Sequence, residues 1–257
     1  MIAHTRSRSP RYLLDLDPEL AEGMDPRVRL VVRRTATVVT FTAGPGELDL
    51  RRWLAITAGG PGLLLVAGAL VSYTQVLDRV VAELVGRGVL LQQPETRSDD
   101  EFLDCDLTWA ALQPTRFAIL DARFADHVRG WPHLTHALLR RAERRATNLA
   151  VQRAIAAQPR LEVRLLLLLW HLATRWGKVE PGGIRVPLPL THLLLGRLVG
   201  AERPSVTHAL KRLVVAGAIS GGEDGWHLRG TLEDQLSPLG AGSNVHRLVP
   251  AAVGHNR

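Results

Sequence analysis

The stretch "RLVGAERPSVTHALKRLVVAGAI" (197–219) decides the fold of the C-terminal third of the chain. Its apolar residues recur at helical spacing, which predicts a helix from about Arg203 to Val215 with one buried face. Pro204 suits the first turn of that helix, where its missing N–H would have no helical partner. The predicted buried residues are Val206, Leu210, Leu213 and Val214. The predicted outward residues are Arg203, Ser205, Thr207, His208, Lys211 and Arg212.

The flanking segments complete a motif. "LTHLLLGRLVG" (190–200) predicts a preceding short helix, with Thr191 as its N-cap and Gly200 as its stop. "AISGGEDGWHLRG" (218–230) has the form of a hairpin around a Gly-rich turn. Two short helices followed by a hairpin indicate a winged helix-turn-helix, whose second helix enters the major groove of DNA. Such units also serve as protein-interaction modules, and this alternative stays open.

Length and composition limit the number of domains, the class of partner and the kinds of site that the chain can have. The chain has 257 residues, 46% of them hydrophobic, which is enough for one large domain or two modest ones. A formal net charge of +7 favours an anionic partner, either nucleic acid or an anionic membrane surface. The single cysteine, Cys105, excludes an internal disulfide and an iron–sulfur cluster, and it fits a reducing cytoplasm.

Two segments bear on membrane association. The N-terminus, "MIAHTRSRSPR", lacks the apolar core of a signal peptide. The apolar run Leu63–Val71 is too short to span a bilayer, so it predicts a buried strand.

The sequence pattern of residues 29–121 is typical of β-strands. Short apolar or β-branched runs separated by Gly, Pro and Asp predict an antiparallel sandwich or barrel. Helix remains an alternative for 76–85, and a short helix limited by Pro18 is expected over 11–21. The runs are "VRLVV" (28–32), "TATVVTFT" (35–42), "LLLVAGALV" (63–71), "VLDRVVAELV" (76–85), "GVLLQ" (88–92) and "RFAILD" (116–121).

The chain turns helical after Trp131. Residues 133–158 predict a long helix with a narrow apolar stripe that packs on its own domain or on a second copy of the chain. The stripe comprises Leu134, Leu138, Ala142, Ala146 and Leu149, and the opposite face carries Arg140, Arg141, Arg144 and Arg145. A buried helix over 160–176 and a short edge strand over 184–189 follow, whereas the tail from Thr231 has no clear period.

"LPLTHLLLGRLVGAERPSVTHALKRLVVAGAI" (188–219) resembles the DNA-binding domain of the Crp/Fnr family of bacterial transcription regulators. "TWAALQPTRFAILDARFADHVRGWPHL" (108–134) is similar to the last strands and following helix of that family's cyclic-nucleotide-binding-like β-roll. The resemblance implies an α+β fold with an antiparallel β-roll, a long dimerisation helix and a C-terminal winged helix-turn-helix. The expected segments are 1–24 (N-terminal segment with a short helix), 25–130 (β-roll), 131–158 (dimerisation helix), 159–230 (DNA-binding domain) and 231–257 (flexible tail).

The resemblance also assigns roles to residues. The family's base-reading positions fall on Arg203, Pro204 and His208, with Ser205 and Thr207 beside the DNA backbone. Arg203 suits a bidentate contact with guanine. Well-known members carry glutamate where this chain has Pro204, so the familiar operator is not expected. Thr191, His192, Lys211 and Arg212 complete the expected DNA-binding set.

The family's effector motif is missing. It captures a cyclic phosphate with a Gly-Glu turn and an arginine, whereas this chain has "GRGVLL" (86–91) and an acidic cluster at the corresponding places. The cluster comprises Asp99, Asp100, Glu101, Asp104 and Asp106. Arg87 and Arg97 are candidate ligands for an anion, although neither falls in the family's motif. A different small-molecule effector, or none, is expected.

No cofactor or catalytic site is expected. His133 and His136 make only half of a metal site, with no carboxylate or thiol at matching spacing. "AGPGE" (43–47) and "AGGPG" (58–62) lack the Lys-Ser/Thr that closes a nucleotide-binding P-loop.

The expected function is sequence-specific binding of double-stranded DNA by a homodimer in a bacterial cytoplasm. RNA polymerase is a further partner that the resemblance allows. Two alternatives stay open: a ligand-blind DNA-binding protein whose β-roll is only a scaffold, and an interaction module or enzyme that keeps the helix-turn-helix for packing.

Overall fold

The computed structural model describes residues 5–6, 10–92, 105–222 and 225–240. The chain forms two compact units, residues 1–151 and 152–257. The long helix α5 (Pro132–Ala156) crosses the boundary between them, so that boundary lies inside the helix that the sequence predicted over 133–158.

The first unit combines short strands with helices. Its strands are β1 (Thr5–Arg6), β2 (Arg11–Tyr12), β3 (Thr37–Ala43), β4 (Gly46–Leu48), β5 (Gly62–Ala67), β6 (Ala69–Val76), β7 (Arg79–Gly86), β8 (Leu90–Leu91), β9 (Cys105–Ala111) and β10 (Thr115–Leu120). Its helices, besides α5, are α1 (Leu13–Leu16), the 3-10 turn η1 (Pro18–Ala21), α2 (Pro26–Thr35), α3 (Arg51–Ile56) and α4 (Ala122–Val128).

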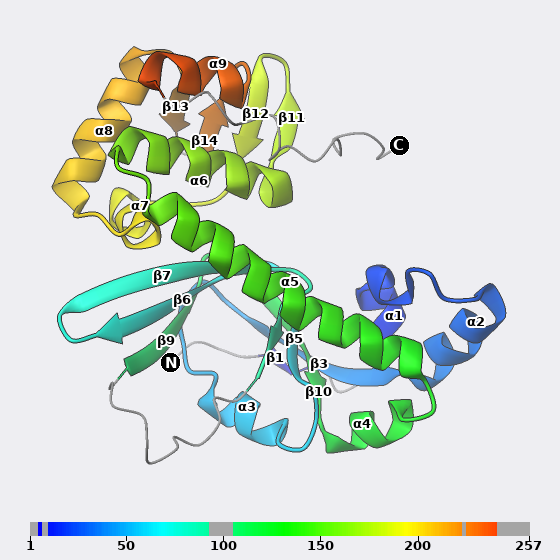
Figure 1. Cartoon of the computed structure of the whole chain (residues 1–257). Helices are drawn as coiled ribbons and strands as arrows, with labels where there is room; N and C mark the ends of the chain where they lie inside the picture. The colour runs from blue at the N-terminus through cyan, green and yellow to red at the C-terminus, as the bar shows by residue number, and fades with distance from the viewer. Residues whose placement is uncertain (1–4, 7–9, 93–104, 223–224, 241–257) are drawn as a thin grey trace. The chain divides into compact units, whose positions relative to one another are not determined.

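These strands form two antiparallel sheets (Figure 1). One has the order β1-β3-β10-β5-β8, with β2 also paired to β3, and the other has the order β4-β9-β6-β7. Gly68 separates β5 from β6, and the chain passes there from one sheet to the other. Its φ of 101° is a left-handed backbone conformation, which favours glycine at this position. The run 63–71 is therefore extended, as predicted, but it forms the end of one strand and the start of another where the sequence predicted a single strand. The run 76–85 lies in the β6–β7 hairpin, which excludes its helical alternative.

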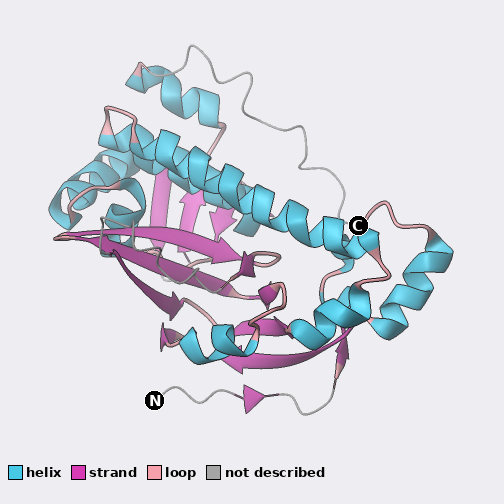
Figure 2. Ribbon diagram, turned by 60° about the horizontal axis from the view of Figure 1, so that its bottom comes forward, coloured by secondary structure: helices cyan, strands magenta, loops and turns pink. Residues whose placement is uncertain are grey.

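The first sheet is buried on both faces. Alternate residues of β5 and β10, such as Leu63 and Phe117, pack toward the second sheet. Their neighbours Leu64 and Ala118 pack against the helices. Figure 2 shows the long helix lying over the strands. This double burial explains why these strands are continuously apolar and do not alternate with polar residues.

The N-terminal residues differ from expectation in two ways. The run "VRLVV" (28–32) lies in helix α2 and is not a strand. Asp25 caps that helix by accepting a hydrogen bond from the backbone N–H of Arg27 at 2.8 Å, and Pro26 occupies its first turn. The described residues before Gly23 also do not form a separate segment, because β1 and β2 pair with β3 of the β-roll. Pro18 divides the short helix expected over 11–21 into α1 and η1.

Helix α5 packs on the β-roll through part of the predicted dimerisation stripe. Leu134 and Leu138 are buried in the same core as the first sheet. Ala142, Ala146 and Leu149 are exposed. The assignment of Leu134 and Leu138 to a dimer seam is therefore wrong, because both side chains stabilise their own unit.

The described residues of the second unit form a four-stranded antiparallel sheet and four α-helices besides the end of α5. Its elements are α6 (Leu161–Trp176), β11 (Lys178–Glu180), β12 (Gly183–Val186), α7 (His192–Val199), α8 (Arg203–Val215), β13 (Ile219–Gly222), β14 (Gly225–Leu228), α9 (Leu232–Leu236) and the 3-10 turn η2 (Ser237–Leu239). The strand order is β11-β12-β14-β13. Among the described residues, no helix is long and apolar enough to cross a membrane.

Residues 232–239 of the tail form α9 and the 3-10 turn η2. Helix α9 packs on α6, where the indole N–H of Trp170 donates to the side chain of Gln235 at 2.8 Å. The amide of Gln235 in turn donates to the backbone carbonyl of Ala218 at 2.8 Å. The expectation of a flexible tail is wrong for 231–240, because the partly buried side chain of Gln235 ties α9 to α6 and to the backbone just before β13. Residues 241–257 lie outside the described part.

Leu138→Ala should lower the free energy of unfolding by about 2–5 kcal/mol, because it leaves a cavity between α5 and the sheet. Leu30→Ala is the matched control, since Leu30 is 51% exposed on α2 and its truncation should change stability by less than about 0.5 kcal/mol. Urea unfolding followed by tryptophan fluorescence measures both. Equal losses for the two variants would contradict the burial of Leu138.

Candidate nucleic-acid interface

Helices α7 and α8 are joined by the tight turn that the sequence predicts. The hydroxyl of Thr191 caps α7 by accepting from the backbone N–H of Leu194 at 3.2 Å. Gly200 ends α7 in the left-handed conformation, with φ of 67°. A Cβ on Gly196 would lie 2.4 Å from the carbonyl oxygen of Ala201, so only glycine lets the turn fold back this closely. The predicted cap and stop are both confirmed.

Helix α8 begins at Arg203 with Pro204 in its first turn, as expected. It packs on α6 and α7 through one apolar face. The buried residues of that face are Val206, Ala209, Leu210 and Leu213. The prediction for Val214 is wrong: its side chain is 45% exposed, because it lies at the edge of the stripe while Ala209 lies inside it.

The opposite face of α8 is exposed. It carries every residue of this helix that the sequence assigned to DNA: Arg203, Pro204, Ser205, Thr207, His208, Lys211 and Arg212. Three of these are permanently cationic, and α8 contains no acidic residue. The face therefore presents positive charge, hydroxyl groups and an imidazole on a rigid helix, which is the chemistry that phosphates and base edges require.

A hydrogen bond connects the two helices at the start of this face. Nδ1 of His192 on α7 lies 2.9 Å from the hydroxyl oxygen of Thr207 on α8. That hydroxyl donates to the backbone carbonyl of Arg203 at 3.0 Å, so its single proton is used and Nδ1 of His192 is the donor. The sequence assigned both residues to DNA, and the structure shows that they also fix each other.

Arg212 is held by a neighbour. Its guanidinium forms an ion pair with Glu162 at the start of α6. Burial acts to raise the pKa of Glu162, but a backbone hydrogen bond and Arg212 outweigh it and hold that pKa below its ordinary value. Arg212 thus differs from Lys211, for which no ion pair is found among the described residues, and sequence reasoning had treated the two alike.

The small sheet forms the wing. The indole N–H of Trp226 on β14 donates to the carbonyl of Leu190 at 3.1 Å, which fixes the wing to the start of α7. Arg185 and His227 are cross-strand partners, and both lie beside Glu180, at 2.6 Å and 3.7 Å. Sequence reasoning missed this polar group, although its residues alternate with the buried Val186 and Leu228 along their strands.

The remaining candidate residues lie in the first unit. Arg87 contacts Leu16 and Asp17 of the N-terminal segment. Arg97 and most of the acidic cluster lie outside the described residues. His133 and His136 are exposed on α5, and no group of metal-ligating side chains occurs in the described ranges.

Comparison with known families gives one match. Residues 163–232 match the family model of the Crp-like helix-turn-helix domain, which spans α6 to the start of α9. No match is found among curated proteins.

Solved structures share this fold over most of the chain. A CooA mutant from Carboxydothermus hydrogenoformans is 15% identical, with a TM-score of 0.58, over 91% of this chain and 97% of that one. A cyclic nucleotide-binding domain containing protein from Listeria monocytogenes is 14% identical, with a TM-score of 0.61, over 75% and 89%. A CRP family transcriptional regulator from Thermus thermophilus is 19% identical, with a TM-score of 0.57, over 77% and 95%. The chain therefore has the fold of the Crp/Fnr regulators, and the resemblance found in its sequence is confirmed.

Arg212→Gln should destabilise the second unit by about 0.2–1 kcal/mol at neutral pH, because it removes the ion pair with Glu162. Folding lowers the pKa of Glu162, so the pair stabilises above pH 4.5, the ordinary value, and this stabilisation is lost as the pH falls further. The difference between variant and wild type should therefore vanish in acid. Lys211→Gln is the control and should keep the wild-type pH dependence. Identical pH profiles for all three proteins would show that the ion pair does not form in solution.

Proposed function

We propose that this chain is a sequence-specific DNA-binding transcription regulator of the Crp/Fnr type. The observation that carries the proposal is the exposed face of α8, which has three permanent cations and no acidic residue. Buried contacts with α6 and α7 hold this helix, and the wing lies in the same unit. The Crp-like helix-turn-helix model over 163–232 supports the same conclusion.

The residues of the face divide into base readers and backbone contacts. Arg203 and His208 read base edges from the N-terminal half of α8, and Pro204 offers no acceptor to a cytosine. Ser205, Thr207, Thr191 and His192 lie beside the DNA backbone. Lys211 contacts phosphate, whereas Arg212 contributes less because it must first leave Glu162.

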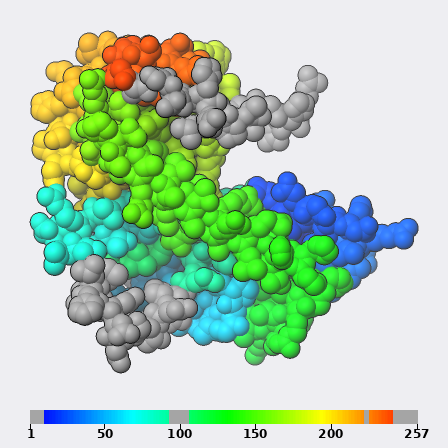
Figure 3. Space-filling view, viewed as in Figure 1, coloured from blue at the N-terminus to red at the C-terminus, as the bar shows by residue number. Residues whose placement is uncertain are grey.

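The regulator acts as a homodimer through a seam on α5 that is shifted from the stripe found in the sequence. The seam comprises Leu139, Ala142, Ala146 and Leu149, at spacings of three, four and three, which is the repeat of a coiled coil. Leu139 is 62% exposed and Leu149 37%. Figure 3 shows the surface of α5 (green) uncovered along the viewed face. Small alanines between two leucines allow two such helices to approach closely.

The β-roll lacks the usual cyclic-nucleotide capture motif, so this regulator does not respond to cAMP in the usual way. It works in the cytoplasm, it is a regulator and not an enzyme, and RNA polymerase is its further protein partner. Selection of bound duplexes from a random pool, followed by sequencing, identifies the operator. A dimer with recognition helices about 34 Å apart requires that operator to be palindromic.

Arg203→Ala should cost roughly 1–3 kcal/mol of binding free energy on the selected operator and relax the preference at one base position. Lys211→Ala should weaken binding to all sequences about equally and reduce the salt dependence by about one charge. Gel shifts or fluorescence anisotropy on selected and scrambled duplexes at several salt concentrations measure both. Glu202→Gln, just before α8, is the control for a general change of charge.

Two outcomes would contradict this assignment. If Arg203→Ala loses affinity equally on selected and scrambled DNA, Arg203 is only a phosphate contact. If the wild-type chain selects no duplex from the pool, the helix-turn-helix is an interaction module and the proposed function is wrong.

Ala146→Asp should convert the dimer to monomers, because it places two carboxylates in the closely packed seam. Thr147→Asp, exposed on α5 but turned about 100° away from Ala146, should remain dimeric. Light scattering at micromolar concentration distinguishes the two states. A monomeric wild type, or a dimeric Ala146→Asp protein, would contradict the shifted seam.

A further inference from the structure

Helix α2 presents two exposed apolar side chains between two arginines. Leu30 is 51% exposed and Val31 is 48% exposed. Arg27 lies three residues before Leu30, and Arg34 lies three residues after Val31. At about 3.6 residues per turn these four exposed side chains lie on one side of the helix, and they form what we term the outer face of α2. Figure 1 shows α2 (blue) at one end of the β-roll unit.

The inner side of α2 attaches the helix to its own unit. Val32 is fully buried in the core that the helices share with the first sheet, and Val28 packs against the same core. The guanidinium of Arg33 also donates to both carboxylate oxygens of Asp15 on α1, at 2.6 and 3.0 Å. Leu30 lies two residues from each valine and therefore on the opposite side of the helix, so the core of the unit does not use it.

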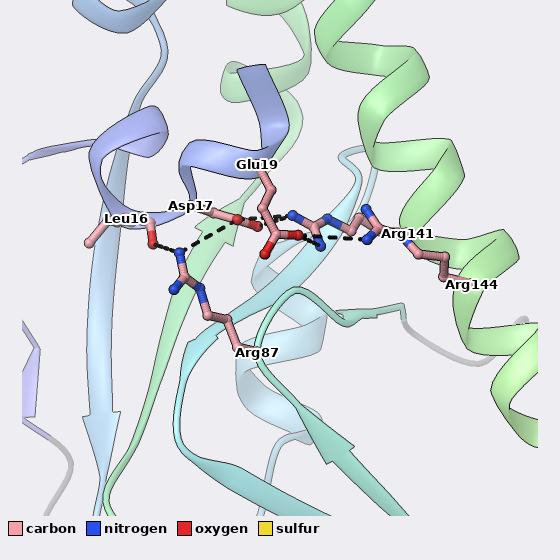
Figure 4. Close-up of polar contacts among 6 residues, drawn as sticks. All are labelled: Leu16, Asp17, Glu19, Arg87, Arg141 and Arg144. Carbon is pink, nitrogen blue, oxygen red and sulfur yellow. Dashed lines mark hydrogen bonds and ion pairs between the residues drawn. The ribbon is translucent and has the colours of Figure 1, made fainter. Parts of the chain in front are cut away.

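The segment that leads into α2 is anchored to α5 (Figure 4). Arg141 of α5 donates through Nη2 to both carboxylate oxygens of Asp17, at 2.8 and 2.9 Å, and through Nη1 to Glu19 at 2.9 Å. Asp17 and Glu19 lie just before and within η1, the turn that precedes α2. The outer face is therefore carried on a support that apolar and ionic contacts hold in place. A surface that is already fixed loses little conformational entropy when a partner binds.

The two arginines of the outer face carry charge that the described part of the chain does not neutralise. Helix α2 contains four arginines and no acidic residue. Arg27 and Arg34 form no ion pair with the described residues. Two carboxylates of neighbouring segments have other partners: Asp25 accepts from the backbone N–H of Arg27 as the helix cap, and Asp15 pairs with Arg33. The outer face thus has an apolar centre with a cation at each end.

We propose that the outer face of α2 is a docking surface for an acidic amphipathic helix of another protein. The apolar residues of that helix cover Leu30 and Val31, and its carboxylates bind the guanidinium groups of Arg27 and Arg34. Two helical turns, about 10 Å, separate the two arginines along α2, so carboxylates seven residues apart in the partner match them. Helices are commonly recognised through such anchors at i, i+3, i+4 and i+7. Guanidinium groups bind carboxylates through paired, charge-assisted hydrogen bonds, which defines the partner as acidic.

The chemistry of the outer face fits a protein better than DNA or a membrane. DNA would satisfy the two arginines but would place the apolar pair against charged and hydrated phosphates. A helix that lies in a membrane surface sinks a large apolar face between the lipids. Helix α2 cannot do so, because Val32 holds it on the unit and its outer face offers only two half-exposed apolar side chains.

The test is a selection of displayed peptides on the full chain. The library holds a helical peptide that is randomised at positions i, i+3, i+4 and i+7. The wild type should enrich aspartate or glutamate at the two outer positions and large apolar residues at the two inner ones. The double variant Arg27→Glu, Arg34→Glu should instead enrich lysine or arginine at the outer positions, because a reversed charge on one side requires a reversed charge on the other.

Fluorescence anisotropy with one enriched peptide measures the contribution of each side chain. Arg34→Glu and Leu30→Ala should each weaken binding by at least about tenfold, the first by placing like charges together and the second by removing an apolar anchor. Both side chains are exposed, so the melting temperature should stay that of the wild type. Arg29→Glu is the matched control, because Arg29 is exposed on the same helix but turned about 140° away from Arg34. It should bind the peptide nearly as well as the wild type does.

Several results would overturn the proposal. One is a wild-type selection without the acidic and apolar pattern, and another is an equal loss of peptide affinity in Arg29→Glu and Arg34→Glu. Sedimentation with vesicles of phosphatidylcholine and phosphatidylglycerol that Arg34→Glu abolishes would assign the face to a membrane. A loss of affinity for scrambled duplexes in Arg34→Glu as large as that in Lys211→Ala would assign it to DNA. The peptide experiments contain no DNA, so their outcome is independent of the function proposed for the second unit.

Discussion

The burial of Leu134 and Leu138 against the β-roll fixes the rotation of α5, and much of the first unit depends on that rotation. Arg141 then points at Asp17, and Arg145 one turn later reaches Glu83 on β7 at 2.8 Å. Both arginines thus face the β-roll and not solvent. The same rotation leaves Ala142, Ala146 and Leu149 uncovered. One apolar contact therefore decides which residues of α5 lie in the core, which form ion pairs and which remain exposed.

In the second unit too, the burial of one helix face determines which side chains are exposed. Burying one face of α8 determines which polar residues face outward, but neighbouring elements then compete for some of them. Arg212 forms an ion pair with Glu162, and Thr207 forms a hydrogen bond with His192. Lys211 has no such partner among the described residues. A cation that already forms an ion pair must break that pair before it binds a phosphate. Residues of equal charge on one face therefore contribute differently to phosphate binding.

The two units place charge differently. In the β-roll unit, carboxylates and arginines meet inside the protein, where each charge needs an opposite charge to be tolerated. In the helix-turn-helix unit, cations gather on an exposed helix with few carboxylates nearby. The first arrangement joins segments of the chain that are distant in sequence, as the pair of Arg141 and Asp17 shows. The second suits a large, highly charged anion such as DNA, which binds through many separate contacts.

The sequence by itself determined the local features whose signals lie within a few residues: the bounds of α8, the Thr191 cap, the Gly200 stop and the extended backbone on either side of Gly68. The sequence did not determine which face of a helix or strand packs against which other element. The run 28–32 has strand-like composition, yet the Asp25 cap and the packing of Val32 make it helical. Periodicity in 133–158 revealed a stripe, but only the tertiary structure showed that Leu134 and Leu138 pack inside while Ala146 and Leu149 do not. The pairing of Arg141 with Asp17 joins residues 124 positions apart. Such a contact depends on how the β-roll brings distant segments together, and no local pattern of residues encodes it.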